Sequence, residues 1–192
     1  MRAEFTGDPL TDAEIEELLQ AAHAAPSVGN SQPWDFIVVR DPKILGSFAD
    51  HVAGCRQDYA DSLDEERRAT FNPIKIEGIR ESGLGIVATY DPTRSGPNVL
   101  GRHTIDEAGV FSVVCAIQNL WLMATAHDIG VGWVSFYKEP FLKELLGLPS
   151  HVRPVGWLCV GKVTKLQETP DLVRFGWNSR MPLEDVIHHD RW

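Results

Sequence analysis

The sequence predicts an α+β fold, in which helices and strands are intermixed along one chain. Four blocks rich in aromatic and β-branched residues predict strands, and several stretches with helical spacing of apolar residues separate them. A long apolar helix is predicted between the second and third strands. The 192 residues are enough for one domain with a sizeable core and too few for two. We therefore expect residues 1–192 to form one domain.

The first helix is predicted to begin at Thr11, because Thr11-Asp12-Ala13-Glu14 has the spacing of a capping box. Apolar residues follow at helical spacing as far as Ala25, and Pro26 closes the helix. Trp34 to Arg40 (WDFIVVR) then predicts the first strand.

The next stretch with a clear pattern runs from Tyr59 to Glu81, which is charged and is predicted to be helical with a break around Asn72-Pro73. Leu84 to Tyr90 (LGIVATY) predicts the second strand. Glycines and prolines without periodicity indicate a loop from Thr93 to Arg102, which we interpret as a candidate lid over a site.

The strongest helical pattern runs from about Asp106 to His127, and Thr104-Ile105-Asp106-Glu107 predicts a second capping box at its start. Its middle (AGVFSVVCAIQNLWLMATA) is apolar on nearly every face, so all of its faces should be buried. This pattern favours a homodimer formed across the helix. A central core helix in a monomer is the alternative.

The remaining elements are shorter. Val131 to Tyr137 (VGWVSFY) predicts a third strand, and Pro140 to Leu146 a helix that stops at Gly147. Val155 to Val163 predicts a fourth strand, and a short helix is expected near Leu183 to Ile187.

Composition excludes several classes of function. The chain has 18 Lys and Arg against 27 Asp and Glu, a formal net charge of −9, which argues against binding to nucleic acid. No apolar run reaches the roughly 18 residues of a membrane span, and no secretory signal is evident, so we expect no membrane partner and a cytoplasmic location. The three cysteines have neither zinc-site nor disulfide spacing.

Two loops are candidate ligand sites. Residues 25–34 (APSVGNSQPW) join a helix end to a strand start and offer free amides and hydroxyls for an anion or the polar edge of a heterocycle. In Gly130 to Ser135 (GVGWVS), the glycines permit close approach to a flat ligand and Ser135 offers a hydroxyl. Either stretch could also be plain connection, a turn in the first case and a strand after a capping glycine in the second.

Other chemistries have weaker support. His188-His189-Asp190 could bind a metal, but adjacent histidines on a tail are usually solvated, and we expect no metal site. Ser27 and His23 could form a nucleophile and base, yet there is no GxSxG elbow and no third orienting group. P-loop, HExxH and EF-hand patterns are absent from the sequence.

The segment AAHAAPSVGNSQPWDFIVV (Ala21 to Val39) resembles the flavin-binding signature of the nitroreductase superfamily. Its APSVGxxQPW form is similar to the 5,6-dimethylbenzimidazole synthases, the BluB family. The resemblance continues through four further blocks, in the same order along essentially the whole chain: Lys75 to Arg80, Leu100 to Arg102 with Ser112 to Leu122, Gly130 to Ser135 with Trp157 to Gly161, and Arg180 to Asp185.

This resemblance implies a nitroreductase-like, FMN-dependent α+β sandwich that forms a homodimer with flavin at the interface. The residues implied to hold FMN are Arg2, Pro26, Ser27, Val28, Gly29, Gln32 and Leu100, with Trp133, Val134 and Ser135 beside the ring and Arg180 near the phosphate. Ser135 matches the functional serine of the family. Reduced FMN is implied to be substrate as well as ligand, O2 the co-substrate, and NAD(P)H an electron source.

The family's N-terminal pattern is Arg-Arg-Asp-x-Arg-x-Glu-Phe, with a catalytic aspartate, whereas this sequence begins Met1-Arg2-Ala3-Glu4-Phe5. Either the start is placed too late or the segment has been lost; the family-like pocket favours a late start. Three functions stay open: a synthase that fragments reduced FMN, an NAD(P)H-dependent nitroreductase-like oxidoreductase that retains FMN, and a flavin-binding module without turnover.

Overall fold

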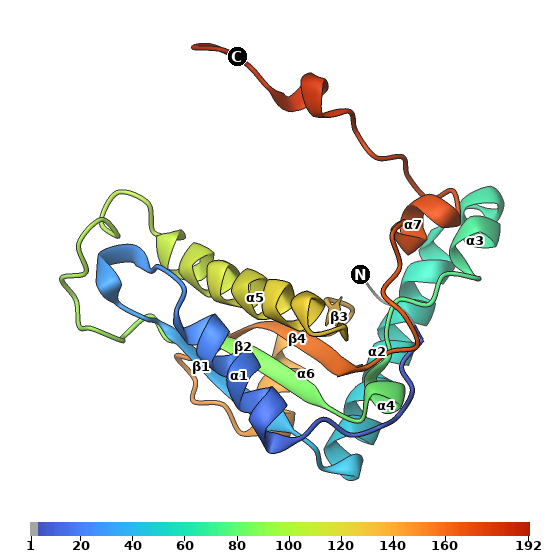
Figure 1. The fold of residues 1–192 in the computed structure, drawn as a ribbon, viewed down its shortest axis with the longest axis horizontal. Helices are drawn as coiled ribbons and strands as arrows, with labels where there is room; N and C mark the ends of the chain where they lie inside the picture. Colours follow the sequence, from blue (N-terminus) through green and yellow to red (C-terminus); the bar gives the residue numbers. More distant parts are fainter. Residues whose placement is uncertain (1–3) are drawn as a thin grey trace.

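Four antiparallel strands form the centre of the molecule in a computed structural model that describes residues 4–192 (Figure 1). The strands are β1 (Trp34–Val39), β2 (Gly85–Tyr90), β3 (Ile129–Val134) and β4 (Arg153–Lys162), and their order in the sheet is β1-β2-β4-β3. The predicted α+β class is therefore confirmed.

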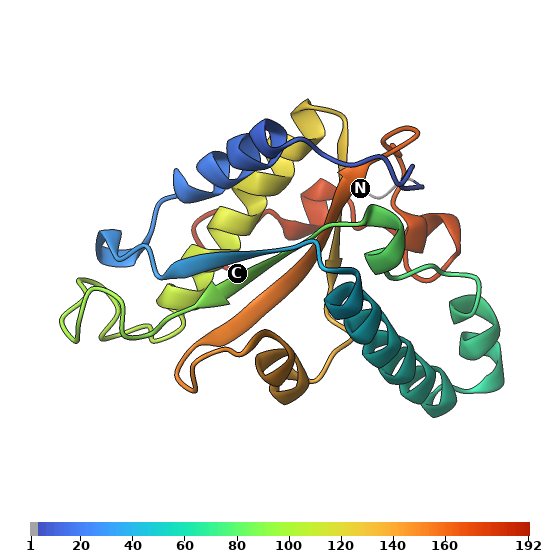
Figure 2. The same cartoon turned by 90° about the horizontal axis from the view of Figure 1, so that it is seen from below.

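Helices cover both faces of this sheet (Figure 2). On one face, α1 (Asp12–His23) and α5 (Ala108–Ala126) share a core with side chains of β2 and β4 such as Ile86 and Leu158. On the other face, α2 (Pro42–Ser62) and α6 (Glu139–Leu146) pack on alternate residues of the same strands, among them Val87 and Trp157. This alternation follows from the two-residue period of a strand. The result is a three-layer sandwich.

Smaller elements connect and flank these layers. They are η1 (Val28–Asn30), α3 (Glu65–Phe71), α4 (Ile79–Ser82), α7 (Asp171–Arg174) and η2 (Leu183–Val186). The N-terminal segment is tied to the sheet by a bridge between Phe5 and Val163.

The two predicted capping boxes have different outcomes. At α1 the box is confirmed: the Thr11 hydroxyl accepts from the Glu14 amide at 3.2 Å, and the Glu14 carboxylate accepts from the Thr11 amide at 2.7 Å. At α5 the prediction from Thr104 is wrong, because the helix begins at Ala108 and no side chain caps it. The Ala108 amide donates to the Ile105 carbonyl, so the chain is already turned where an extended capping residue would be needed.

Helix α2 was missed by the pattern reading, which began its second helical segment only at Tyr59. Asp41 caps this 21-residue helix by accepting from the Lys43 amide at 2.8 Å, and Pro42 occupies its first position. Beyond α2, the expected break near Asn72-Pro73 is present after α3, and the left-handed Gly147 ends α6 as predicted.

The third predicted strand ends three residues early. β3 stops at Val134, and the Tyr137 amide donates to the Ser135 carbonyl at 3.0 Å, which turns the chain out of the sheet. Ser135 consequently lies just beyond the strand instead of within it.

Helix α5 has one buried face and one exposed face. Its inner face packs on the sheet and against α1, whereas an outer face remains exposed in the single chain. We call Phe111, Val114, Cys115, Gln118 and Leu122 the outer face of α5. The prediction that no apolar run has the length of a membrane span is wrong, because α5, alone among the described helices, is long and apolar enough to cross a membrane. Because its inner face lies in the core, we assign it to the sandwich.

Candidate functional site

The loop between α1 and β1 carries the first predicted ligand residues, and hydrogen bonds to its own backbone and to α5 hold it. The Ser27 hydroxyl accepts from the Gln32 amide at 3.0 Å, which closes the loop on itself. The Val28 amide donates to the hydroxyl of Ser112 in α5, also at 3.0 Å. The loop is thereby fixed against the start of the central helix.

Gly29 lets a second loop approach the first one closely. It has φ of 55°, and a Cβ at this position would lie 2.8 Å from the Leu100 backbone nitrogen. A larger residue would therefore have to move one of the two loops. Leu100 itself is 82% exposed, so its side chain is available to a ligand or partner.

The segment from Thr93 to Arg102, interpreted above as a candidate lid, is tied to the body at several points. Arg94 binds both carboxylate oxygens of Asp35, at 2.6 and 2.7 Å, and the Ser95 hydroxyl donates to the Ser31 carbonyl at 3.2 Å. Burial would raise the pKa of Asp91, but hydrogen bonds from Thr93 and nearby positive charge lower it overall. Movement as a lid stays a prediction, which uniformly strong hydrogen-exchange protection would contradict.

The second predicted ligand segment follows β3. Trp133 lays its indole over Gly156 of β4, where a Cβ would collide with the ring. Ser135 is exposed and lines a cavity of about 370 Å³, together with Val110, Tyr137, Glu139, Arg153, Pro154 and Val155. Burial raises the pKa of Tyr137, so its phenol stays protonated at neutral pH and can donate a hydrogen bond.

Sheet topology brings both segments to one end of the sheet. Trp34 at the start of β1 pairs with Tyr90 at the end of β2, which pairs with Arg153 at the start of β4. The end of β3 lies on the other side of β4, so roughly 14 Å, three strand spacings, separates the outermost strands. The start of α5 lies between them, with Ser112 bonded to the first loop and Val110 in the cavity of the second.

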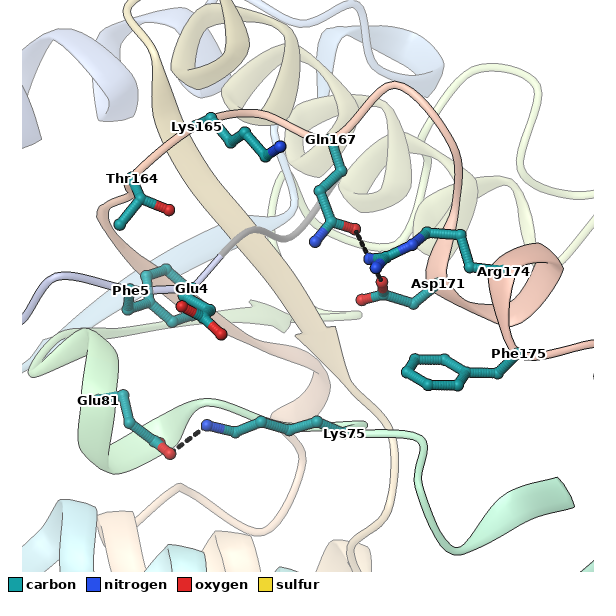
Figure 3. Close-up of a pocket in the computed structure, with 10 residues that line it drawn as sticks. All are labelled: Glu4, Phe5, Lys75, Glu81, Thr164, Lys165, Gln167, Asp171, Arg174 and Phe175. Carbon is teal, nitrogen blue, oxygen red and sulfur yellow. Dashed lines mark hydrogen bonds and ion pairs between the residues drawn. The ribbon is translucent and has the colours of Figure 1, made fainter.

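A second cavity, of about 620 Å³, lies at the opposite end of β4 (Figure 3). Lys75, Lys165 and Arg174 supply its positive charge. Lys75 pairs with Glu81, and Arg174 binds Asp171 and Gln167, each at 2.9 Å. The cavity is also lined by Glu4 and by Phe175, so the two terminal segments of the chain meet there.

The structure groups the predicted residues unevenly. The loop that follows Pro26 brings Ser27, Val28, Gly29 and Gln32 together with Leu100, and the end of β3 brings Trp133, Val134 and Ser135 together. Val134 is 2% exposed and its side chain packs toward α2, so only its backbone can meet a ligand. Arg180 lies exposed in the C-terminal tail, which leads away from the body in Figure 1. Arg2 lies outside the described residues.

The weaker candidates gain no support from the geometry. His23 accepts a hydrogen bond from the Trp34 indole at 3.1 Å, while the Ser27 hydroxyl is bonded to Gln32, so no nucleophile–base pair forms. His188 and His189 are exposed in the tail, and no cluster of three or more metal-ligating side chains occurs in residues 4–192.

Some relevant residues were missed by the sequence reading. Ser112 was visible as a hydroxyl among apolar residues in the first half of α5, which is a usable signal for a buried hydrogen bond. Tyr137 carried no such signal, and the charges around the second cavity come from three distant stretches of sequence.

The first loop also contains a buried polar atom without a partner. Ser31 is 2% exposed, and among the described residues its hydroxyl and the Trp157 indole nitrogen are the buried side-chain polar atoms that lack a hydrogen bond. Such a group is costly unless a ligand or water satisfies it. Together with the exposed Ser135 hydroxyl and the partly buried Trp133 indole near β3, this donor set fits a flat heterocycle with polar edges, as flavin has.

Comparison with known proteins agrees with this geometry. The family model described as Nitroreductase family matches residues 1–162. A 5,6-dimethylbenzimidazole synthase from Rhodospirillum rubrum is 37% identical over 178 residues, covering 93% of this chain and 84% of that protein. A protein of the same name from Rhodobacter capsulatus is 30% identical, covering 94% and 87%.

A solved structure has the same fold. The BluB-like flavoprotein from Clostridium difficile 630 superposes with a TM-score of 0.72 at 18% identity, covering 100% of this chain and 95% of that one. From the family model and these relatives, this chain belongs to the nitroreductase family.

Proposed function

We propose that this protein is a flavin-dependent enzyme that fragments reduced FMN with O2 to give 5,6-dimethylbenzimidazole, the lower ligand of cobalamin. The observation that carries the proposal is the 37% identity, over 93% of the chain, to a relative named for that synthase. The PSVG loop and Ser135, which lie at one end of the sheet, give the proposal a site.

The residues of the chain divide into two groups around the proposed ligand. Lys75, Lys165 and Arg174 would hold the phosphate at the cavity of Figure 3, where Lys75 and Arg174 would exchange their ion pairs with Glu81 and Asp171 for phosphate oxygens. Trp133 and Ser135 would meet the ring. Along β4, six residues separate Trp157, the partner of Val134, from Val163, the partner of Phe5, or about 20 Å. That span suits an extended flavin mononucleotide.

Reduced flavin supplies the electrons that O2 accepts, and in this reaction it is also the molecule that is cleaved. The chain would contribute hydrogen-bond donors at fixed positions. Ser135 offers its hydroxyl at the cavity, and Tyr137, whose pKa burial raises further above its ordinary value of 10.0, is a protonated donor at neutral pH. Donors held in place before charge develops lower a barrier more than mobile water does.

The proposed site is completed by a second copy of the chain. The outer face of α5 exposes Phe111 by 56% and Leu122 by 59%, beside the cavities at the start of the same helix. Contiguous exposed apolar surface of this kind marks an interface. A homodimer across α5 would cover it and bring the partner close to the cavity that Val110 and Ser135 line.

The dimer can be tested with one charge. Phe111→Glu would bury a carboxylate in the proposed interface, and we expect the dimer to dissociate to monomer in light scattering after gel filtration. Leu172→Glu, on an exposed apolar residue of α7, is the control and should stay dimeric. A monomeric wild-type protein, or a dimeric Phe111→Glu protein, would contradict this interface.

The second candidate is an NAD(P)H-dependent oxidoreductase that retains FMN, favoured by the match of residues 1–162 to the wider nitroreductase family. Purification discriminates the two functions. A protein that leaves the column yellow and oxidises NAD(P)H with a nitro or quinone acceptor supports the second. A colourless protein that binds added reduced FMN supports the first, because a consumed substrate must enter and leave. Absence of flavin binding in either redox state would contradict both.

A further inference from the structure

The segment after Ser135 is held by helix α2, and one of its contacts involves a titratable group. Phe136 packs against Tyr59 near the end of α2, with ring centroids 5.5 Å apart, and Tyr137 packs against Phe48 at 5.7 Å. The Lys138 amide donates to Nε2 of His51 at 3.0 Å. Three consecutive residues after Ser135 are thus anchored to one helix.

His51 is well fixed for this role. Its ring stacks on Phe141 of α6, with centroids 3.8 Å apart and an interplanar angle of 5°. Because a backbone amide can only donate, Nε2 must be the unprotonated nitrogen, and the proton of the neutral imidazole is on Nδ1. The Cys55 sulfur, 3.6 Å from the same Nε2, can then only be a weak donor.

We infer that His51 is a positioning residue, which holds residues 135–138 and therefore Ser135 in place through the hydrogen bond it accepts from the Lys138 amide. The inference rests on the proposed function, since Ser135 is the residue that the segment presents to flavin. His51 touches no ligand itself and acts only through the segment.

Protonation of His51 would break this contact, because Nε2 would then carry a hydrogen that faces the Lys138 amide. Burial lowers the pKa of His51, and the charge of Lys138 lowers it further, so the ring is neutral at neutral pH. The titratable groups described near the ring are Cys55 of α2 and Lys138. The neighbour from α6 is the uncharged Phe141, and Arg80 of α4 binds Asp50 of α2 instead.

The sign of the pH effect follows from the lowered pKa. Above 6.5, the ordinary value, the ring is neutral in both folded and unfolded protein and the contact is intact. As the pH falls below 6.5, the unfolded chain takes up the proton first, so the contact loses stability and opens as the pH passes the lower folded pKa.

Two variants separate the roles of the ring. His51→Gln offers an amide oxygen that can accept from Lys138 but does not titrate. His51→Phe keeps an aromatic ring against Phe141 but has no acceptor. Two measurements apply to each in a titration downward from pH 7.5: the protection factor of the Lys138 amide by hydrogen-exchange NMR, and the dissociation constant for reduced FMN under anaerobic conditions.

We expect the wild-type Lys138 amide to be protected at pH 7.5 and to lose protection once the pH has fallen through the lowered pKa of His51, His51→Gln to stay protected throughout, and His51→Phe to be unprotected throughout. Flavin affinity should fall about tenfold in His51→Phe, the equivalent of one hydrogen bond. Because residue 51 does not titrate in His51→Gln, any change of flavin affinity with pH in this variant measures the titration of the FMN phosphate itself. If the Lys138 amide is equally protected in the wild type and in both variants, the inference about His51 is overturned while the proposed function stands. A wild-type protein that binds no flavin would overturn the proposed function and, with it, the role of the segment.

Discussion

The loop 27–32 and the segment 135–138 lie at the same end of the sheet but are held in different ways. The first loop is held by its own turn chemistry, with Gly29 in a left-handed conformation and Ser27 bonded to Gln32, and by one hydroxyl of α5. The second has one local turn bond, from the Tyr137 amide to the Ser135 carbonyl, and otherwise depends on side chains of α2. The first can therefore keep its shape locally, whereas the second takes its shape from the packing of two layers.

This difference explains how each region responds to change. A substitution within the first loop should be felt within it and at its neighbour, Leu100. A substitution in the α2 side chains that contact residues 136–138 should displace Ser135, although these side chains do not contact Ser135 themselves. Predictions for the two regions are therefore separable.

The largest expected effect is that of Ser135→Ala on turnover. The hydroxyl is exposed, so the free energy of unfolding should not change, while the rate of product formation from reduced FMN should fall about 100-fold if a preorganised donor is lost. Product is measured by mass spectrometry. Ser47→Ala, at another exposed serine, is the control. Undiminished product from Ser135→Ala would remove Ser135 from the chemistry.

Gly29→Ala should destabilise the protein by about 2 kcal/mol, since it adds backbone strain and a clash with Leu100. Gly7→Ala is the matched control, because Gly7 has φ of 81° and no atom within 4 Å of the added Cβ. It should cost about 1 kcal/mol from strain alone. Urea unfolding gives both values. Equal losses would mean that the contact with Leu100 is unimportant.

Ser112→Ala sharpens the comparison at the first loop. It leaves the Val28 amide without its acceptor in a half-buried position, at an expected cost of about 1 to 2 kcal/mol. Hydrogen exchange should show faster exchange at Val28 and no change at Lys138. Equal acceleration at both amides would show that the two regions are not held independently.

The smallest effect is expected at Thr11→Ala, which lies away from both regions and should cost about 1 kcal/mol through loss of the α1 cap. The pKa of Glu14 is lowered chiefly by its hydrogen bond from the Thr11 backbone. The contribution of ionised Glu14 to the free energy of unfolding is therefore fully present above pH 4.5, its ordinary pKa, and is lost as the pH falls through the lower folded pKa. Thermal unfolding across pH 3 to 7 (about four pH units) measures it. A variant as stable as wild type at pH 7 would contradict the role of the cap.

Sequence reading was most successful where local chemistry decides the structure. The Thr11–Glu14 capping box, the four strands and the stop at Gly147 all depend on neighbouring residues. It failed at α5, where a capping pattern at Thr104 is overridden by a turn, and at α2, whose cap at Asp41 and apolar stripe were passed over. The candidate site divides in the same way. The turn chemistry of the PSVG loop could be predicted from its own residues. The anchoring of Ser135 could not, because it depends on a hydrogen bond between His51 and Lys138, which are 87 residues apart in the sequence.

The most direct test of the account is an aerobic incubation with chemically reduced FMN of the protein joined to the family's Arg-Arg-Asp segment, which Met1–Phe5 does not contain, with Ser135→Ala in the same protein and protein-free flavin in parallel. The account predicts 5,6-dimethylbenzimidazole by mass spectrometry from the extended protein, far less from its Ser135→Ala variant and none from flavin alone. Flavin that is simply reoxidised in all three samples would contradict the synthase and leave the nitroreductase-like function as the better description.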